Sequence, residues 1–377
     1  FSNLLFSSVL KLVLIDQLVP GEPDVSYKIE VYGHNDFTFR PYRPAWWMTL
    51  LMPWLKLTNR NGTQIPFKIR DFLSVIDWSV RDKTRFDYFI GLESVNTMAG
   101  IFLRALGRVK CVIYYVSDYS PNRYANGFLN SLYLAFDRFC ALRADYIWDV
   151  SKAIQIARIE KGLNPAVCAP VIHVANGLFP DQIGASKNKR RNRHSLVYMG
   201  TVGVENGPDV AIEALALVRN KYKDAMLHMI GGKPSDFAWL LPIIQKRKLT
   251  NAVVHHGFVP KAADMMRIMN TCSVGLAPYR AYPGSARWYG DAGKLRAYSG
   301  AGLATVSSHV PPLGAELAAN GAAVIARDNA TSFARAIVGI FDNRPLREKL
   351  CANATRFAST NTWEHQFSTA FEKMRLL

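Results

Sequence analysis

The segment Val197–Pro208 reads VYMGTVGVENGP, which combines an apolar strand-like run, a glycine-containing turn and a proline that opens a helix. Glycine has no Cβ, so the main chain of such a turn can approach an anionic group closely. The amino terminus of the following helix also offers unpaired N–H groups to a phosphate. The segment therefore predicts a βα unit whose turn is suited to a phosphate-bearing ligand, although many βα turns contain such glycines.

Apolar runs that alternate with helix-like segments continue on both sides. Before the segment, strands are expected at residues 27–32, 88–91, 110–116, 146–150 and 171–174, with a helix over 126–143; after it, strands are expected at 225–230, 252–256, 273–277 and 304–307. Buried strands alternating with helices are typical of parallel sheets covered on both faces. We therefore predict an α/β chain of two doubly wound, Rossmann-like domains facing a cleft, residues 1–183 and 195–377, joined by a basic linker over 184–194.

Charge is the most unusual feature of the composition. The 377 residues include 46 Lys and Arg against 29 Asp and Glu, a net charge of +17. This excess favours an anionic partner such as a phospholipid surface, a nucleic acid or a phosphorylated substrate. The five cysteines are scattered and never in CxxC spacing, which argues against zinc or a disulfide framework and favours a cytosolic chain. The sequence contains no apolar run of about 18 residues, so no membrane-spanning helix is expected.

The first sixty residues carry a different signal. Asn3–Val19 is apolar and predicted to be helical, and Ala45–Leu57 (AWWMTLLMPWLKL) has three tryptophans between basic residues. A short Trp-rich segment with basic flanks suits a membrane headgroup interface; packing on the sheet or over the cleft is the alternative. No signal peptide is evident, and we expect Phe1 to be a truncated start that lacks the first strand of the fold.

Two later segments add candidate ligand contacts. Ser273–Tyr279 (SVGLAPY) predicts a strand with a Pro-Tyr corner, and Gly293–Val306 predicts a helix with Lys294 in its first turn. A lysine at a helix start adds positive charge where N–H groups already point, which suits a phosphate. A solvated surface lysine is the alternative. Arg280 and Arg287, between the two segments, are further candidates for binding an anionic sugar or a diphosphate.

The order of these pieces resembles the donor-binding domain of GT-B glycosyltransferases, in particular of families 1 and 4. The matching motifs are Tyr198–Thr201, His256–Pro260, Val274–Tyr279, Lys294–Thr305 and Thr362–Trp363. The resemblance implies a nucleotide-sugar site in which Lys294 contacts the diphosphate. The other donor-binding residues that it implies are Gly200, Thr201, Val202, Gly257, Phe258, Val259, Tyr279 and Tyr298.

Three departures separate the chain from many members of that superfamily. Tyr289 and Ala297 stand where the others have a glutamate pair, Thr201 replaces a common arginine, and Ala304 replaces the proline after the helix glycine. These departures argue against a standard retaining mechanism.

The first domain is more faintly similar to the membrane-associated glucuronosyltransferase of xanthan assembly, an inverting GT-B enzyme. Gly91–Ser94, Ile113–Asp118, Phe136–Arg138 and Val174–Gly177 carry this similarity. It implies that Asp118, at the end of a strand, is the general base, with Glu93 as the second candidate; capping of a turn is the alternative role of Asp118. The last helix, at about residues 362–377, is expected to pack back on this domain.

We therefore expect a hexosyltransferase that moves a sugar from a nucleoside-diphosphate sugar, specifically a UDP-sugar, to a lipid-linked or polysaccharide acceptor. Inversion is expected, with no cofactor and no metal ion, because no acidic cluster suits a divalent cation. The enzyme would act in polysaccharide biosynthesis, peripherally on the anionic inner face of the cytoplasmic membrane, and would bind no nucleic acid. A GT-B-fold sugar-nucleotide epimerase, an inactive homologue and a basic nucleic-acid-binding protein remain as alternatives.

Overall fold

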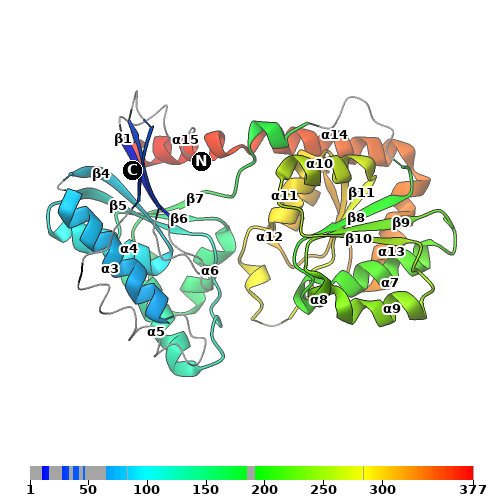
Figure 1. Cartoon of the computed structure of the whole chain (residues 1–377), viewed down its shortest axis with the longest axis horizontal. Helices are drawn as coiled ribbons and strands as arrows, with labels where there is room; N and C mark the ends of the chain where they lie inside the picture. Colours follow the sequence, from blue (N-terminus) through cyan, green and yellow to red (C-terminus); the bar gives the residue numbers. More distant parts are fainter. Residues whose placement is uncertain are drawn as a thin grey trace. The chain divides into compact units, whose positions relative to one another are not determined.

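The strands form three sheets in the part of the chain that the structure describes. The computed structural model describes residues 11–16, 28–33, 37–41, 46, 65–82, 84–184, 192–282 and 284–376. The chain divides into two compact units, residues 1–174 with 367–377, and residues 175–366 (Figure 1). Most of the predicted linker, 184–194, lies outside the described residues.

The first unit contains a parallel sheet with the strand order β4-β5-β6-β7. Its elements are α3 (Ile65–Asp82), β4 (Phe86–Leu92), α4 (Glu93–Ala105), β5 (Val109–Val116), α5 (Gly127–Arg143), β6 (Tyr146–Asp149), α6 (Lys152–Glu160) and β7 (Val171–His173). Alternate residues of a strand point to opposite faces. Accordingly Val112 packs in a cluster with Leu103 of α4, whereas Tyr115 makes an edge contact with Phe367 of α15 (Trp363–Leu376).

The end of α15 covers one face of this sheet. The ring of Phe371 lies 5.7 Å from that of Tyr88 and 5.3 Å from that of Trp148. The Tyr146 hydroxyl donates to the main-chain oxygen of Met374 at 3.0 Å. The last residues of the chain therefore belong to the core of the first unit.

A separate antiparallel sheet precedes α3. It consists of β1 (Lys11–Asp16), β2 (Lys28–Gly33) and β3 (Phe37–Pro41). The predicted helix over residues 3–19 is wrong at residues 11–16, because this short apolar run pairs with β2; the strand predicted over 27–32 is confirmed. The Trp-rich segment lies outside the described residues except for Trp46, whose side chain is exposed.

The second unit has a six-stranded parallel sheet with the order β10-β9-β8-β11-β12-β13. Its main elements are β8 (Ser195–Met199), α7 (Pro208–Val218), β9 (Met226–Ile230), α8 (Pro234–Phe237), α9 (Leu241–Lys246), β10 (Val253–Gly257), α10 (Ala262–Thr271), β11 (Val274–Ala277), α11 (Gly293–Gly300), β12 (Ala304–Ser307), α12 (Pro312–Ala319), β13 (Ala323–Ile325), α13 (Ala330–Asp342) and α14 (Arg344–Thr360). Of these strands, only β13 was not predicted.

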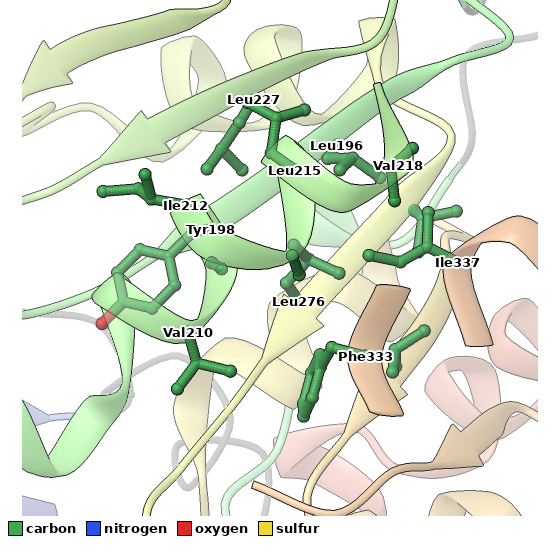
Figure 2. Packing of buried hydrophobic residues seen from close by; sticks show 14 of the residues in the cluster. Leu196, Tyr198, Val210, Ile212, Leu215, Val218, Leu227, Leu276, Phe333 and Ile337 are labelled. Atoms are coloured by element: carbon green, nitrogen blue, oxygen red, sulfur yellow. The ribbon is translucent and has the colours of Figure 1, made fainter. Parts of the chain in front are cut away.

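Apolar side chains from both the sheet and the flanking helices build the core of the second unit. In Figure 2, Leu215 and Val218 of α7 and Phe333 and Ile337 of α13 surround Leu196 of β8. Parallel strands point their carboxyl ends to one edge, so this core fixes the positions of the turns that follow β8, β9 and β10. The predicted α/β architecture with two parallel sheets is confirmed.

Candidate active site

Glycine turns lie at the carboxyl ends of three neighbouring strands in the second unit. Gly200 follows β8, Gly231 follows β9 and Gly257 ends β10, with φ angles of 120°, 113° and 67°. The Gly200 N–H donates to Ile230 O at 2.8 Å, and the Gly231 N–H donates to Gly257 O at 2.7 Å. A Cβ at Gly231 would lie 2.3 Å from the oxygen of Gly200. The turns therefore form one closely packed edge that needs glycine there.

Lys294 projects from the first turn of α11 toward this edge. Its side-chain nitrogen, Nζ, is buried and has no hydrogen-bond partner in the described structure. Nζ lies 4.1 Å from the ring centre of Tyr198 and 4.4 Å from that of Tyr279. A Cβ at Gly200 would be 3.7 Å from Nζ. The structure thus brings Lys294, Tyr279 and Gly200 together.

The Lys294 ammonium group is strongly desolvated. Burial, and then the nearby charge of Arg287, lower the pKa of Lys294 well below its usual 10.5, while Glu205 acts in the opposite direction. Burying a cation without a counter-ion is costly. The contacts with two aromatic faces offset only part of this cost. The surroundings of Lys294 are therefore suited to receiving an anion.

The turn after Gly200 supplies main-chain donors. Among the described residues, the main-chain N–H groups of Thr201, Val202 and Gly203 donate no internal hydrogen bond. The Thr201 hydroxyl accepts from Asn206 Nδ2 at 2.6 Å. The side chain of Val202 is buried, so Val202 can reach a ligand only through its main chain.

Tyr298 lies in the core and not beside a ligand. Its side chain is fully buried, and its hydroxyl accepts from the Met199 N–H at 2.8 Å and donates to Leu276 O at 3.0 Å. These bonds hold together the ends of β8 and β11. The donor contact expected of Tyr298 stays a prediction, while its hydroxyl is already used in hydrogen bonds within the fold.

The loop after β10 presents an exposed aromatic ring. Phe258 is 75% exposed, and Val259 is partly buried against the cluster that contains Tyr279. Behind the loop, His255 Nε2 lies 3.0 Å from Gly231 O, and its ring stacks on Phe237 at 4.0 Å. Strand β10 thus ends at Gly257, and the ring of Phe258 extends into solvent.

Glu205 is a charged neighbour that the sequence did not single out. Its Oε1 lies 3.9 Å from the Arg287 side-chain nitrogen Nη2. Both groups act on the pKa of Lys294, in opposite directions. An acidic residue just before a helix looks like an ordinary favourable helix-dipole residue, so nothing in the sequence distinguishes Glu205.

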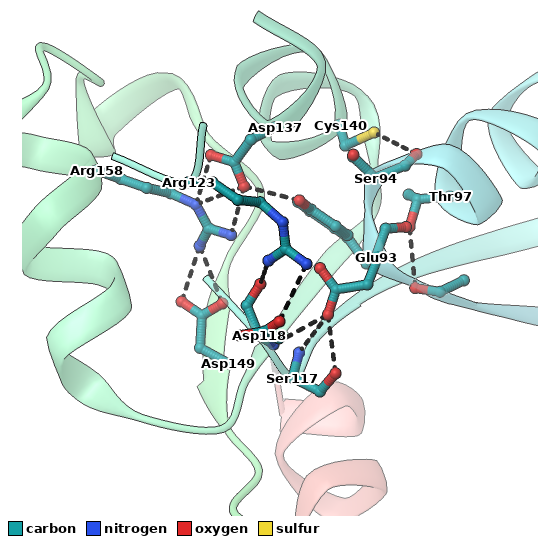
Figure 3. Close-up of polar contacts among 12 residues, drawn as sticks. Glu93, Ser94, Thr97, Ser117, Asp118, Arg123, Asp137, Cys140, Asp149 and Arg158 are labelled. Atoms are coloured by element: carbon teal, nitrogen blue, oxygen red, sulfur yellow. Dashed lines mark hydrogen bonds and ion pairs between the residues drawn. The ribbon is translucent and has the colours of Figure 1, made fainter. Parts of the chain in front are cut away.

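In the first unit, Glu93 occupies the turn between β4 and α4. Its φ is 63°, an uncommon value for a residue with a side chain. Its Oε1 accepts from the Ser117 N–H at 3.0 Å, the Ser117 hydroxyl at 2.8 Å and the Asp118 N–H at 3.0 Å (Figure 3). Burial raises the pKa of the Glu93 carboxyl, and the bonds from Ser117 oppose that rise. Glu93 therefore holds the end of β5 in place.

Asp118 stands just beyond β5 with an exposed side chain. Its Oδ2 lies 3.0 Å from the Arg123 nitrogen Nη2, and Arg123 Nη1 donates to the Asp118 main-chain oxygen at 2.7 Å. The side chain is 59% exposed. Of the two predicted catalytic carboxylates, Asp118 is thus open to solvent, whereas Glu93 is engaged with the main chain.

A buried ion network underlies this region and was not predicted. Arg158 of α6 binds Asp137 of α5 and Asp149 of β6, with distances of 2.9 Å to each carboxylate. The Tyr114 hydroxyl also donates to Asp137 at 2.7 Å. Figure 3 shows the guanidinium between the two carboxylates. All three charged groups are paired within the fold, so the network is structural.

The sequence matches the family model described as glycosyl transferases group 1 over residues 193–343. This region contains the glycine turns and Lys294. No curated protein matches the chain in sequence.

Several solved structures share the fold. Sucrose-phosphate synthase from Thermosynechococcus elongatus matches with a TM-score of 0.66 and 14% identity, over 96% of this chain and 87% of that chain. Anabaena HepE in complex with UDP has a TM-score of 0.63 and 17% identity, over 83% and 82%. WaaG, a glycosyltransferase involved in lipopolysaccharide biosynthesis, has a TM-score of 0.55 and 16% identity, over 81% and 95%. Residues 193–343 therefore resemble the glycosyl transferases group 1 family, and the chain shares the fold of these solved structures.

Proposed function

We propose that the enzyme transfers a hexose from a UDP-sugar to a lipid-linked or polysaccharide acceptor, with inversion and without a metal ion. The observation that carries this proposal is the buried Lys294 ammonium, which has no hydrogen-bond partner among the described residues and lies beside the Gly200 turn. A diphosphate bound there would supply the missing negative charge. We propose UDP as the nucleotide because HepE, a protein of similar structure, was solved in complex with UDP.

Lys294 and the main chain would stabilise the departing diphosphate. As the glycosidic bond forms, the bond from the anomeric carbon to the phosphate oxygen breaks and the diphosphate leaves with the electron pair. Preorganised charges and N–H groups aimed at developing charge are effective because they need no reorganisation. Here these are the Lys294 ammonium and the N–H groups of Thr201–Gly203. Among the described residues, no group of three His, Cys, Asp or Glu side chains could hold a metal ion.

Asp118 would be the general base. The acceptor hydroxyl must lose its proton as it attacks the anomeric carbon, and an exposed carboxylate at the end of a strand can receive it. Arg123 orients this carboxylate, and Glu93 fixes the main chain that bears it. Glu93 is thus assigned a positioning role.

The outer face of α5 supports a membrane-bound acceptor. Large apolar side chains are exposed along one stripe of the helix, at Phe128, Leu132, Phe139 and Leu142. Their spacing of four, seven and three residues is that of a single helical face. Exposed Arg138 and Arg143 lie on the same helix. Among the described residues, no helix is long and apolar enough to span a membrane. An apolar stripe with basic neighbours suits the surface of an anionic bilayer.

Lys294→Met tests the donor site. We expect the Kd for UDP to rise at least about tenfold, because a charge-assisted contact contributes roughly 1.5–3 kcal/mol. Without UDP, the variant should melt at a higher temperature than the wild type, since an unpaired buried charge is removed. Calorimetry and thermal melting measure both effects. Lys261→Met, at an exposed lysine, is the matched control, and unchanged UDP binding by Lys294→Met would contradict the proposal.

The lowered pKa of Lys294 also predicts a pH dependence. The folded chain binds fewer protons at this site than the unfolded chain does, so the free energy of unfolding without ligand should increase with pH between the lowered pKa and 10.5. Urea unfolding across that interval measures the slope. Lys294→Met should remove this contribution; an identical slope in both proteins would show that other groups cause it.

Asp118→Asn tests the base. We expect kcat to fall by about 10²–10⁴-fold, while UDP still raises the melting temperature. Glu93→Gln should instead lower the stability, because its carboxylate accepts three hydrogen bonds. Transfer assayed with and without EDTA, with the product anomer identified by NMR, completes the experiment. A product of retained configuration, or a normal rate in Asp118→Asn, would refute this mechanism.

Phe128→Ser with Phe139→Ser tests the membrane surface. We expect the double variant to bind phosphatidylglycerol vesicles at least about fivefold more weakly in sedimentation, because two apolar anchors are lost. Its UDP binding should stay normal. Leu217→Ser, at an exposed leucine of α7, is the control. Equal vesicle binding by the double variant and the wild type would exclude α5 as the contact surface.

A further inference from the structure

A basic cavity lies at the edge of the sheet in the second unit that is opposite the glycine turns. Its volume is about 500 Å³, and it is lined by Arg193, Ser273, Arg347, Glu348, Cys351, Ala352 and Thr355. Arg193 precedes β8 and Ser273 precedes β11, so both stand at the amino ends of neighbouring parallel strands. Lys294 and the glycine turns stand at the carboxyl ends.

One face of α14 forms the other wall. Arg347, Cys351 and Thr355 are spaced four residues apart and therefore lie in one row along the helix. Ser273 Oγ donates to Asn192 O at 2.7 Å, and Thr355 Oγ1 donates to Cys351 O at 3.1 Å. Both hydroxyl protons are thus in use, and the hydrogen-bond donors left for a ligand are those of the two arginines.

The two guanidinium groups are incompletely paired. Arg347 Nη1 is buried and has no hydrogen-bond partner in the described structure. The Arg193 nitrogen Nη2 makes only a long contact, 3.4 Å, to Phe341 O. An unpaired buried donor is costly, which indicates that a polar partner normally occupies the space beside it.

The acidic groups nearby already have partners of their own. The Glu348 carboxylate accepts from Arg344 Nε at 2.7 Å. The Asp342 carboxylate, which interacts electrostatically with Arg193, accepts from Lys221 at 2.6 Å. The cavity therefore keeps a net positive charge.

We propose that this cavity binds a phosphoryl-bearing anion at a site separate from the donor site. Guanidinium groups bind phosphoryl oxygens with paired, charge-assisted hydrogen bonds. The ligand would be a phosphate ester whose phosphoryl group lies between Arg193 and Arg347. The same group can belong to a dissolved phosphate compound or to a lipid headgroup, and the two sources are distinguished below.

Inorganic pyrophosphate is the probe for the dissolved source. The full chain carrying Lys294→Met is used, so that binding at the proposed donor site is weakened. Binding is measured by calorimetry at constant ionic strength. We expect saturable binding that Arg193→Gln and Arg347→Gln each weaken at least tenfold. Lys349→Gln, at an exposed lysine of α14, should leave it unchanged. Equal binding in the arginine variants and in the control would overturn the proposal.

A measurement without further substitution guards against variants that fail to fold. Cys351 lines the cavity and Cys168 lies in the other unit, and both are partly buried thiols. Pyrophosphate should slow alkylation of Cys351 by iodoacetamide at least fivefold, as followed by peptide mass spectrometry, and should leave Cys168 unaffected. Protection by phosphatidylglycerol vesicles, with none by pyrophosphate, would assign the site to a lipid headgroup. Protection by neither would refute the site.

Discussion

In the described structure, the Lys294 ammonium is buried beside two aromatic rings without a hydrogen-bond partner. It lies at the carboxyl ends of the strands in the six-stranded sheet of the second unit. Gly200 lies beside Nζ, and its φ of 120° is a conformation that favours glycine. Tyr298 bonds the ends of β8 and β11 and so holds this edge in place. A buried cation destabilises the unliganded protein, and a bound anion would offset this cost.

The buried charges of the first unit described here are paired within the fold, in contrast to Lys294. Arg158 is matched by Asp137 and Asp149, and Glu93 accepts hydrogen bonds from Ser117 and Asp118. These groups use their charge within the fold. In the described part of the second unit, Lys294, Arg280, Arg296 and Arg347 each have a buried nitrogen without a hydrogen-bond partner. Lys294 and Arg347 lie at opposite edges of the sheet in this unit, where each can still donate a hydrogen bond to a ligand.

The sequence predicted what local patterns encode. The apolar runs of β5 and β8 identified buried strands, and Lys294 stood out because it opens a helix after a strand with a Pro-Tyr corner. Residues 11–16 were misassigned because a short apolar run fits a helix or a strand equally well until its partner strand is known. The ion network of Arg158 could not be predicted from the sequence, because its partners are 9 and 21 residues away along the chain and meet only in the folded structure.

The backbone conformation of Glu93 bears on the position of Asp118. A residue with a side chain at positive φ costs roughly 1–3 kcal/mol and persists only where its surroundings enforce it. Here the strained conformation places the carboxylate under the end of β5, where it accepts the N–H groups of Ser117 and Asp118. If the residue at this position only had to end β4, a glycine could adopt the same positive φ without strain. The strain is instead explained if the position of Asp118 matters, which is what a carboxylate acting as the base would require.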